Sequence, residues 1–481
     1  MAQAKGILPR RREETESLYG NPRMCGYFIG VTLRSDLDRA AAQQWFQTVS
    51  GYVDELVERL PPEHGQAKGD KVAAVAVGLA PTFFVADGRP RFDRPIELPA
   101  GFDPDTADSP NPQPFDTPDL AAVERVGADV MFYVASIFEA RVAHFIEQIQ
   151  DTAPDVAGIS IDRGYQRIGG KEPFGYADGV RNIARGVRSR HVFVQPDTDV
   201  DEPRWAFGGS YMTFMRIVQD RDAFEALADD AARDAVIGRH RDGTRLDLDS
   251  VDPRREPAEP VPNLPPASHV RKAAPRGHHD DTQIFRRGLP FLELADGRVR
   301  VGLSFASFQS SLDQFDTVLN DWMLSPNFPA DGAGPDALLD PARGFTSIER
   351  VGLYFVPPHD DRHLAATLFD APTRRPREGR LVVRKRVVDP SDARRRFERA
   401  GFRFRVLDSA GHPVGDPFTT SSSGRAVLEA TLTIGSSYTL EELHSPVANV
   451  ALARLTFEMD RPNKQLRVVN SVSQPNTPYG G

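Results

Sequence analysis

The chain has 481 residues, of which 40% are hydrophobic and 26% are charged. This length exceeds one ordinary domain, so two or three folded units are expected, and the composition excludes overall disorder. The formal net charge of -9 excludes bulk electrostatic attraction to nucleic acid, because phosphate binding needs a basic face. We therefore expect no nucleic-acid partner.

The number of cysteines and the first residues of the chain indicate the cellular compartment in which the protein resides. Cys25 is the one cysteine, which excludes an intramolecular disulfide and a thiolate cluster, and fits a reducing compartment. The run Arg10–Arg12 begins like a twin-arginine signal, but polar Glu13–Ser17 replaces the apolar stretch that such a signal needs. No window approaches the ~18 uninterrupted apolar residues of a membrane span. We expect a cytoplasmic protein, with non-classical export as the open alternative.

The first part of the chain predicts elements in the order β-α-β-β-α-β. Tyr27–Leu33 is typical of a buried strand, and Asp36 or Asp38 can cap a helix that reaches Leu60. The remaining predictions are strands Val72–Leu79, Asp129–Ala135 and Val156–Arg163, a helix Ile137–Ile149 and a loop at 87–119. This order indicates a ferredoxin-like unit.

A second part of similar element order begins at Ser210. The predicted elements are strands Tyr211–Val218, Phe291–Leu294, Val299–Phe305 and Glu349–Val356, helices Asp222–Val236 and Phe308–Met323, and a loop at 239–267. The expected fold class is therefore α+β, with two ferredoxin-like halves side by side.

Three short polar clusters lie in and between these halves. They are Gly175–Gly179 (GYADG), His269–Arg276 (HVRKAAPR) and Phe285–Phe291 (FRRGLPF). A haem peroxidase needs an imidazole ligand, a group that moves a proton between the two peroxide oxygens, and a cation that stabilises the developing charge. His269, Asp178 and Arg287 would supply these three functions.

The clusters resemble those of the dye-decolourising peroxidases, a family of haem enzymes with a G-x-x-D-G motif, a proximal histidine in an H-x-R-like segment and a distal arginine downstream. The matching residues are Gly175, Asp178, Gly179, His269, Arg271, Pro275 and Arg287, in family order. His278 and His279 are alternative ligands that lack this context.

The distal arginine has two candidates, because Arg286 precedes Arg287. Family spacing favours Arg287, and alternation lets only one of two neighbouring strand residues face a haem. The segment Gly302–Gln309, with Leu303 and Phe305, resembles the apolar strand that lines the distal pocket. Leu289 departs from the pattern, since many bacterial members have an asparagine there.

The resemblance implies a dimeric α+β barrel-type haem domain over 1–375, with halves at about 20–208 and 209–375. It also implies haem b, hydrogen peroxide as oxidant, and one-electron oxidation of bulky dyes or phenols. Surface aromatics that relay electrons would include Trp205, Trp322 or Tyr354. Asp316 and Asp321 are candidates for the carboxylate that supports His269.

After the charged linker near 375 the pattern changes to short alternating segments. They are Leu381–Val388, Phe402–Leu407, Ala426–Leu432, Tyr438–Leu443, Leu452–Phe457 and Gln465–Val469. Such strands predict an all-β sandwich domain at 376–481, which resembles the prealbumin-like modules of pilins and adhesins.

In those modules a lysine bonds covalently to an asparagine with help from a glutamate, and Lys385, Asn470 and Glu442 occupy comparable positions. Alternatively, Lys385 lies on a solvated strand beside Arg384 and Arg386.

Two functions follow from these features. The first is a haem peroxidase that acts on hydrogen peroxide and an organic reductant. The alternative is a haem-binding or haem-handling protein with weak turnover, whose β-domain contacts an unidentified partner. Assembly into a homo-oligomer is compatible with both.

Overall fold

The computed structural model describes residues 25–57, 73–86, 88–102, 114–115, 117, 120, 123–153, 155–165, 170–180, 183, 187–196, 202–248, 263–273, 282–295, 297–370, 378–389, 397–421, 424–459 and 463–472. The chain divides into two compact units, 1–324 with 328–371, and 325–327 with 372–481. The predicted boundary between 375 and 376 lies outside the described residues, as do Arg10–Arg12, Pro275, His278 and His279.

The first half of the larger unit has the predicted element order. Its main elements are β1 (Cys25–Leu33), α2 (Arg39–Leu56), β2 (Ala73–Leu79), β6 (Val130–Ser136), α4 (Glu139–Gln150) and β7 (Val156–Tyr165). Helix α2 begins after Asp38, whose carboxylate accepts a hydrogen bond from the Ala41 N–H at 2.8 Å. Short elements between and after them are α3 (Pro81–Phe84), β3 (Val85–Ala86), β4 (Arg89–Pro90), β5 (Glu124–Arg125), α5 (Arg188–Val192) and η4 (Arg204–Ala206).

The second half repeats this order with more helical insertions. Its elements are β8 (Ser210–Gln219), α6 (Arg221–Glu225), α7 (Asp230–Ile237), α8 (His269–Ala273), β9 (Phe285–Arg286), β10 (Leu289–Ala295), β11 (Arg298–Gln309), α9 (Leu312–Asp316), the π-helix η6 (Thr317–Met323), β12 (Thr346–Val356) and α10 (Ala366–Phe369).

The two halves share one sheet with the strand order β10-β11-β8-β12-β2-β6-β1-β7. Within each half, the second, third, first and fourth strands follow one another, which is the ferredoxin-like order and confirms the predicted fold class. The halves meet through β12 and β2, where Phe355 pairs with Leu79. No ladder between the edge strands β7 and β10 occurs among the described residues, so the expected barrel is not closed by hydrogen bonds.

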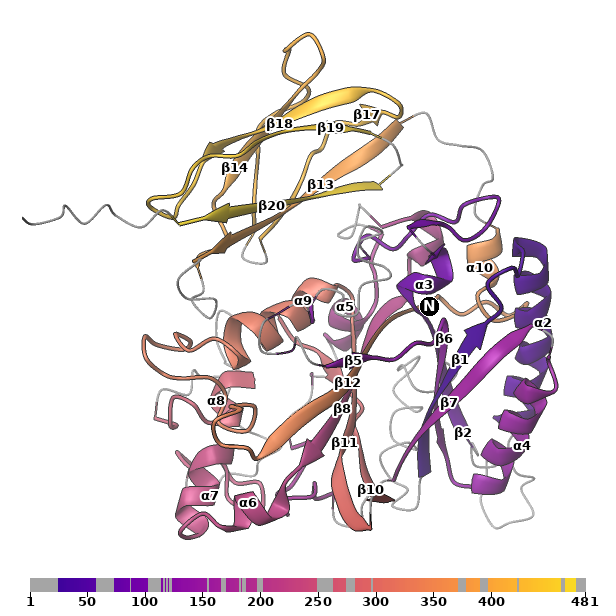
Figure 1. Ribbon diagram of the computed structural model, residues 1–481, viewed down its shortest axis with the longest axis vertical. Helices are drawn as coiled ribbons and strands as arrows, with labels where there is room; N and C mark the ends of the chain where they lie inside the picture. Colours follow the sequence, from indigo (N-terminus) through magenta and orange to yellow (C-terminus); the bar gives the residue numbers. More distant parts are fainter. Residues whose placement is uncertain are drawn as a thin grey trace, which may run out of the picture. The chain divides into compact units, whose positions relative to one another are not determined.

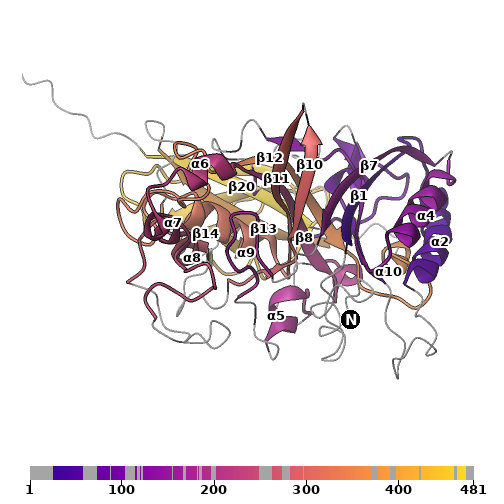
Figure 2. The ribbon, with the colours of Figure 1, turned by 90° about the horizontal axis from the view of Figure 1, so that it is seen from below.

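Helices α2 and α4 cover one face of the first half of the sheet (Figures 1 and 2). Their apolar side chains, including Trp45, Phe46 and Phe145, pack with Phe132 and other residues of β1, β2 and β6 in the largest core cluster. The opposite side of the strands carries a second cluster that joins both halves through Phe28, Tyr133, Phe214 and other buried side chains. We call this second side the inner face.

Two predicted helices differ from the structure. The helix predicted over Asp222–Val236 is two helices, because Asp220 and Asp229 each accept a hydrogen bond from the N–H three residues on and so cap separate starts. The helix predicted from Phe308 starts at Leu312 instead, since β11 continues to Gln309 and Ser311 and Gln314 form a capping box.

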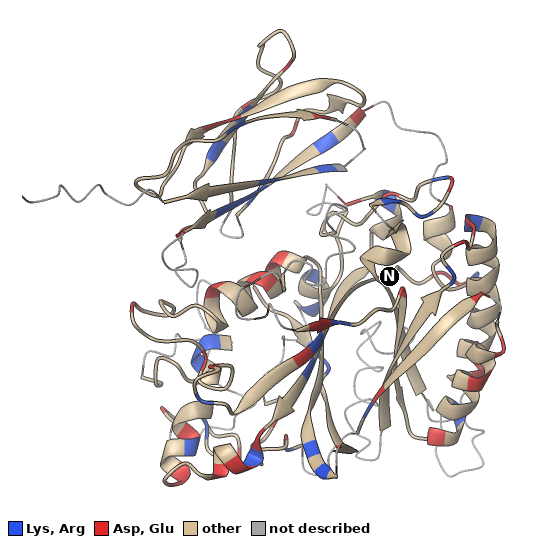
Figure 3. Cartoon of the chain, in the orientation of Figure 1, with Lys and Arg blue, Asp and Glu red and all other residues tan. Residues whose placement is uncertain are grey.

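Charge is distributed with both signs on the same elements, as Figure 3 shows for α6 and α7. A different kind of cluster is buried near the inner face, where Arg216 of β8 contacts Asp162 of β7 at 2.8 Å and Glu293 of β10 at 2.5 Å. This network joins the two edge strands that do not pair by backbone hydrogen bonds. Among the described helices, none is long and apolar enough to span a membrane.

The smaller unit contains two four-stranded sheets that share one apolar core. The strands are β13 (Glu378–Val388), β14 (Arg403–Leu407), β15 (Phe418–Thr419), β16 (Arg425–Val427), β17 (Leu432–Thr433), β18 (Ser437–His444), β19 (Arg454–Glu458) and β20 (Asn463–Ser471). The strand predicted over Ala426–Leu432 is divided between β16 and β17. Strands β13 and β20 run parallel, so the first and last strands of the unit lie side by side.

Candidate functional site

His269 is the first residue of α8, and its ring is held by a buried carboxylate. Its Nδ1 lies 2.9 Å from Oδ2 of Asp336, whose side chain is 0% exposed while that of His269 is 30% exposed. A hydrogen bond at Nδ1 leaves Nε2 as the ring nitrogen that could bind a metal ion. The histidine therefore has the orientation and the supporting group of a metal-binding imidazole.

Asp336 is itself fixed by its surroundings. Its N–H donates to the Met323 carbonyl at 2.7 Å, and its Oδ1 accepts a hydrogen bond from the Leu338 N–H at 2.9 Å. The predicted supporting carboxylates, Asp316 and Asp321, were the wrong choice. Asp316 instead accepts a hydrogen bond from the Asn320 amide at 2.7 Å.

The electrostatics of His269 show which other groups lie near it. Burial alone would lower the pKa of His269, but the Asp336 carboxylate opposes this and the pKa is raised. Arg286 acts to lower that pKa and Asp178 acts to raise it. Both groups are therefore within electrostatic reach of the imidazole, although Asp178 lies 91 residues away in sequence (269 − 178).

The two adjacent arginines face opposite sides of the sheet. Arg286 pairs with Ser307 in the ladder between β9 and β11, and the Ser307 hydroxyl contacts Thr213 Oγ1 at 2.6 Å. Phe285 pairs with Phe308, and both belong to the inner-face cluster. Strand alternation therefore places Arg287 on the side of Phe285, and its guanidinium carbon lies 4.8 Å from the centre of that ring.

The choice of Arg287 as the distal arginine is thus not supported by the geometry. Alternation selects one of the pair, as expected, but the β9–β11 register places Arg286 on the opposite side from the inner face. Leu289, which departs from the family pattern, packs on the inner face, where it approaches Gly26 and Gly164. The position two after Arg286 is Gly288, which also has no amide side chain.

Asp178 lies in a tight loop between two glycines with left-handed backbone. Gly175 has φ +90° and Gly179 has φ +69°, and a side chain at Gly175 would meet Arg241. The Asp178 carboxylate accepts a hydrogen bond from the Gly179 N–H at 2.6 Å, and the Asp178 N–H donates to the Gly170 carbonyl. The carboxylate itself is exposed and oriented by this turn.

The Glu172 side chain holds the same loop by hydrogen bonds to its backbone. Its carboxylate accepts hydrogen bonds from the N–H groups of Phe174 and Tyr176 and from the Gln219 amide, at 2.8–3.0 Å. Burial raises the pKa of Glu172 against these hydrogen bonds. In the sequence, Glu172 is visible only as part of the Glu172–Phe174 flank before the motif, and the pattern does not indicate that its carboxylate clamps the loop.

The predicted lining residues lie on the side of the sheet that carries Arg286. Leu303 and Phe305 alternate with the inner-face residue Ala306, and Phe305 packs against the cluster that contains Phe315 and Leu319. Phe305 thus lies between the sheet and helices α9 and η6, whereas Leu303 lies near Gly288. Separately, the Arg271 guanidinium donates a hydrogen bond to the Leu264 carbonyl, which ties α8 to the segment before it.

The three aromatics predicted as surface relays are all buried. Trp205, Trp322 and Tyr354 are 6%, 4% and 0% exposed. Trp205 packs in the first-half core with its indole N–H bonded to the Glu97 carbonyl, and Tyr354 lies in the inner-face cluster. Direct contact with a bulky reductant is therefore excluded for these three positions in this conformation.

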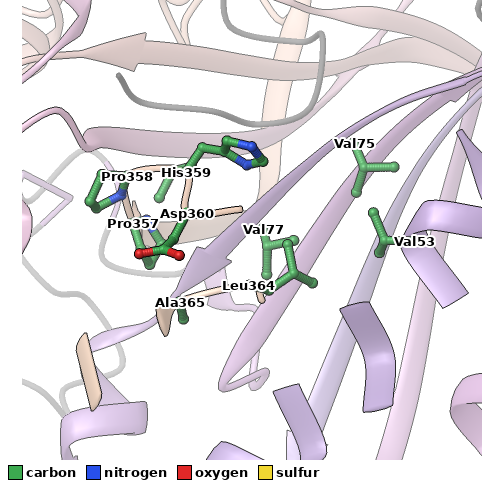
Figure 4. Close-up of a pocket in the computed structure, with 10 residues that line it drawn as sticks. Val53, Val75, Val77, Pro357, Pro358, His359, Asp360, Leu364 and Ala365 are labelled. Carbon is green, nitrogen blue, oxygen red and sulfur yellow. The ribbon is translucent and has the colours of Figure 1, made fainter. Parts of the chain in front are cut away.

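A small pocket that His269 does not line lies between α2 and β2 of the first half and residues 356–365 of the second half. Val53 of α2 and Val75 and Val77 of β2 line it, together with His359 and Asp360 (Figure 4). Its volume, about 20 Å³, holds one or two water molecules at most.

In the smaller unit, three polar side chains meet inside the core. Lys385 Nζ lies 2.9 Å from Glu442 Oε1, and both side chains are 0% exposed. Asn470 Nδ2 donates to Glu442 Oε2 at 2.8 Å and to the Ala451 carbonyl at 2.7 Å. The alternative of a solvated Lys385 is wrong, because the amine is buried over the Phe402 ring at 4.9 Å.

A family model, a curated relative and solved structures that are similar to this chain all come from the same family. Residues 171–361 match the model described as "Dyp-type peroxidase, C-terminal". Dye-decolorizing peroxidase msp1 of Mycetinis scorodonius is 24% identical in an alignment 235 residues long, and this alignment covers 35% of this chain and 46% of the relative. The chain thus spans about half the length of this curated relative.

Solved structures show the same fold. A DyP-type peroxidase from Cellulomonas bogoriensis is 19% identical with a TM-score of 0.53, and DtpA from Streptomyces lividans is 21% identical with a TM-score of 0.55. Each match covers 73% of this chain and 94% of the other chain. The matched segment 171–361 contains Asp178, His269, Arg286 and Asp336.

Proposed function

Because the chain belongs to the DyP-type peroxidase family, we propose that it uses haem b to reduce hydrogen peroxide and oxidises bulky organic molecules such as dyes and phenols in one-electron steps. The observation that carries this proposal is the buried Asp336 carboxylate on Nδ1 of His269, with Asp178 and Arg286 in electrostatic reach of the same ring. One imidazole, one carboxylate and one guanidinium are the groups that the reaction needs.

The donor set fits a haem. His269 Nε2 would ligate the iron, and the apolar side chains of Leu303 and Phe305, which share the side of the sheet with Arg286, would contact the macrocycle. Gly175 and Gly179 would let the loop backbone approach closely, and Arg271 would help to hold α8 in place. Haem supplies the iron that binds the peroxide oxygen and stores oxidising equivalents.

The remaining residues handle protons and charge. The Asp178 carboxylate would take a proton from the near oxygen of hydrogen peroxide and return it to the far oxygen, which leaves as water. The Arg286 guanidinium would stabilise the negative charge on the departing oxygen. Asp336 keeps the proton on Nδ1 of His269 and makes the ring a stronger donor.

A spectrum and a turnover assay test this function together. The purified chain, loaded with haem, should show a Soret band that changes on one equivalent of hydrogen peroxide, and peroxide should drive oxidation of an anthraquinone dye. Stable haem binding with no spectral response to peroxide would contradict the peroxidase proposal and favour the haem-handling alternative. Free haem at the same concentration sets the level of dye oxidation that must be exceeded.

For the smaller unit we propose an internal covalent bond between Lys385 and Asn470. The Lys385 amine would attack the Asn470 side-chain carbonyl carbon, and Nδ2 would leave as ammonia. Glu442 would move the proton from the amine to Nδ2, to which it is already hydrogen-bonded. Burial lowers the pKa of Lys385 against the pull of Glu442, which favours the neutral, nucleophilic amine.

Intact mass tests this bond. The mass should be lower than the sequence mass by one ammonia, and Glu442→Gln should restore the full mass. The matched control is Glu441→Gln on the same strand, which should keep the lower mass because Glu441 instead pairs with Arg405 at 2.7 Å. A wild-type chain at its full sequence mass would refute the bond.

A further inference from the structure

A buried lysine lies one helical turn after His269. Lys272 is 0% exposed, and its Nζ donates a hydrogen bond to the Trp322 carbonyl at 3.1 Å. A buried ammonium is costly unless a partner compensates its charge. Because residues three apart share a helix face, Lys272 and His269 lie on the side of α8 that faces η6 and the turn after it.

The carboxylate that acts on the Lys272 ammonium is the one that holds His269. Asp336 is equally buried, and its N–H binds the carbonyl of Met323, the residue after Trp322. Burial lowers the pKa of Lys272 to about 8, and the Asp336 carboxylate acts in the opposite direction. Lys272 and Asp336 bind the neighbouring carbonyls of Trp322 and Met323, which places the ammonium close to the carboxylate that holds His269.

We propose that Lys272 is a positioning residue whose ammonium balances the Asp336 carboxylate and so limits the negative charge that Asp336 passes to the His269 imidazole. A carboxylate partner makes a ligating imidazole more electron-donating, and a nearby cation weakens this effect. Since the proposal rests on haem ligation by His269, Lys272 would raise the reduction potential of the bound iron.

The haem-loaded protein provides the first test. Lys272→Gln removes the charge and keeps an N–H donor for the Trp322 carbonyl, whereas Lys272→Arg keeps the charge. The midpoint potential should shift to more negative values in Lys272→Gln and the ferrous iron–histidine stretching frequency should rise. Lys272→Arg and the exposed control Lys171→Gln should match the wild type. An unchanged potential in Lys272→Gln would overturn the proposal.

The second test needs no haem. In apo-protein, Lys272→Gln should lower the unfolding midpoint in the wild-type background and lower it much less in the Asp336→Asn background, because the charge to be balanced is then absent. Equal losses in both backgrounds would overturn the pairing. Failure of wild-type protein to bind haem would refute the proposed function instead, and the double-mutant cycle would still decide the role of Lys272.

Discussion

Asp178→Asn is expected to slow the reaction with hydrogen peroxide by about 10²–10⁴-fold while haem stays bound, because an amide cannot accept and return the peroxide proton. The backbone of the loop should persist, since Gly175 and Gly179 set its turn and Glu172 anchors it. Stopped-flow absorption of the Soret band measures this rate directly.

The matched control for Asp178 is Asp408→Asn. Asp408 caps a turn of the smaller unit by accepting a hydrogen bond from the Ala410 N–H at 2.9 Å. This variant should react with peroxide at the wild-type rate. A rate for Asp178→Asn close to that of the control would remove Asp178 from the proton-transfer role.

Substitution of the two adjacent arginines, Arg286 and Arg287, should have different effects on the rate of the peroxide reaction. Arg286→Met should lower the rate of the peroxide reaction by about 100-fold or more, as loss of one stabilising donor does in other enzymes. Arg287→Met should leave this rate close to the wild-type value, because Arg287 packs on Phe285 at the inner face. The same stopped-flow assay serves for both variants.

Arg286→Lys tests the kind of group that is needed. It should recover part of the rate that Arg286→Met loses, because the positive charge is kept and the fork of N–H donors is not. The assignment fails if Arg287→Met shows the large loss and Arg286→Met does not. The unfolding midpoint of each variant shows whether a lower reaction rate is caused by a loss of folded protein.

The fold was predictable because its signals are local. The strand at Tyr27–Leu33 and the helix after Asp38 show in the spacing of their own apolar residues and in one capping residue. Repetition of that order in the second half indicated the ferredoxin-like pair. The sequence predicts one helix where the structure has α6 and α7. The reason is that the apolar spacing alone does not show whether Asp229 lies inside a helix or caps a new one.

The site was predictable only in part, because its contacts are not local. His269 and Asp178 lie in recognisable clusters, but Asp336 is 67 residues from His269 and joins it through the turn after η6. The choice between Arg286 and Arg287 required the pairing of Phe285 with Phe308, which no spacing rule supplies. Lys272 was visible only as part of a basic segment, and its burial under η6 gives it a different role.

The central claim is that His269, supported by Asp336, ligates haem iron. Resonance Raman spectroscopy of the ferrous, haem-loaded protein tests it most directly. The wild type should show an iron–histidine stretching band, His269→Ala should lack it, and Asp336→Asn should keep it at a lower frequency. A band of unchanged frequency and intensity in His269→Ala would contradict the claim.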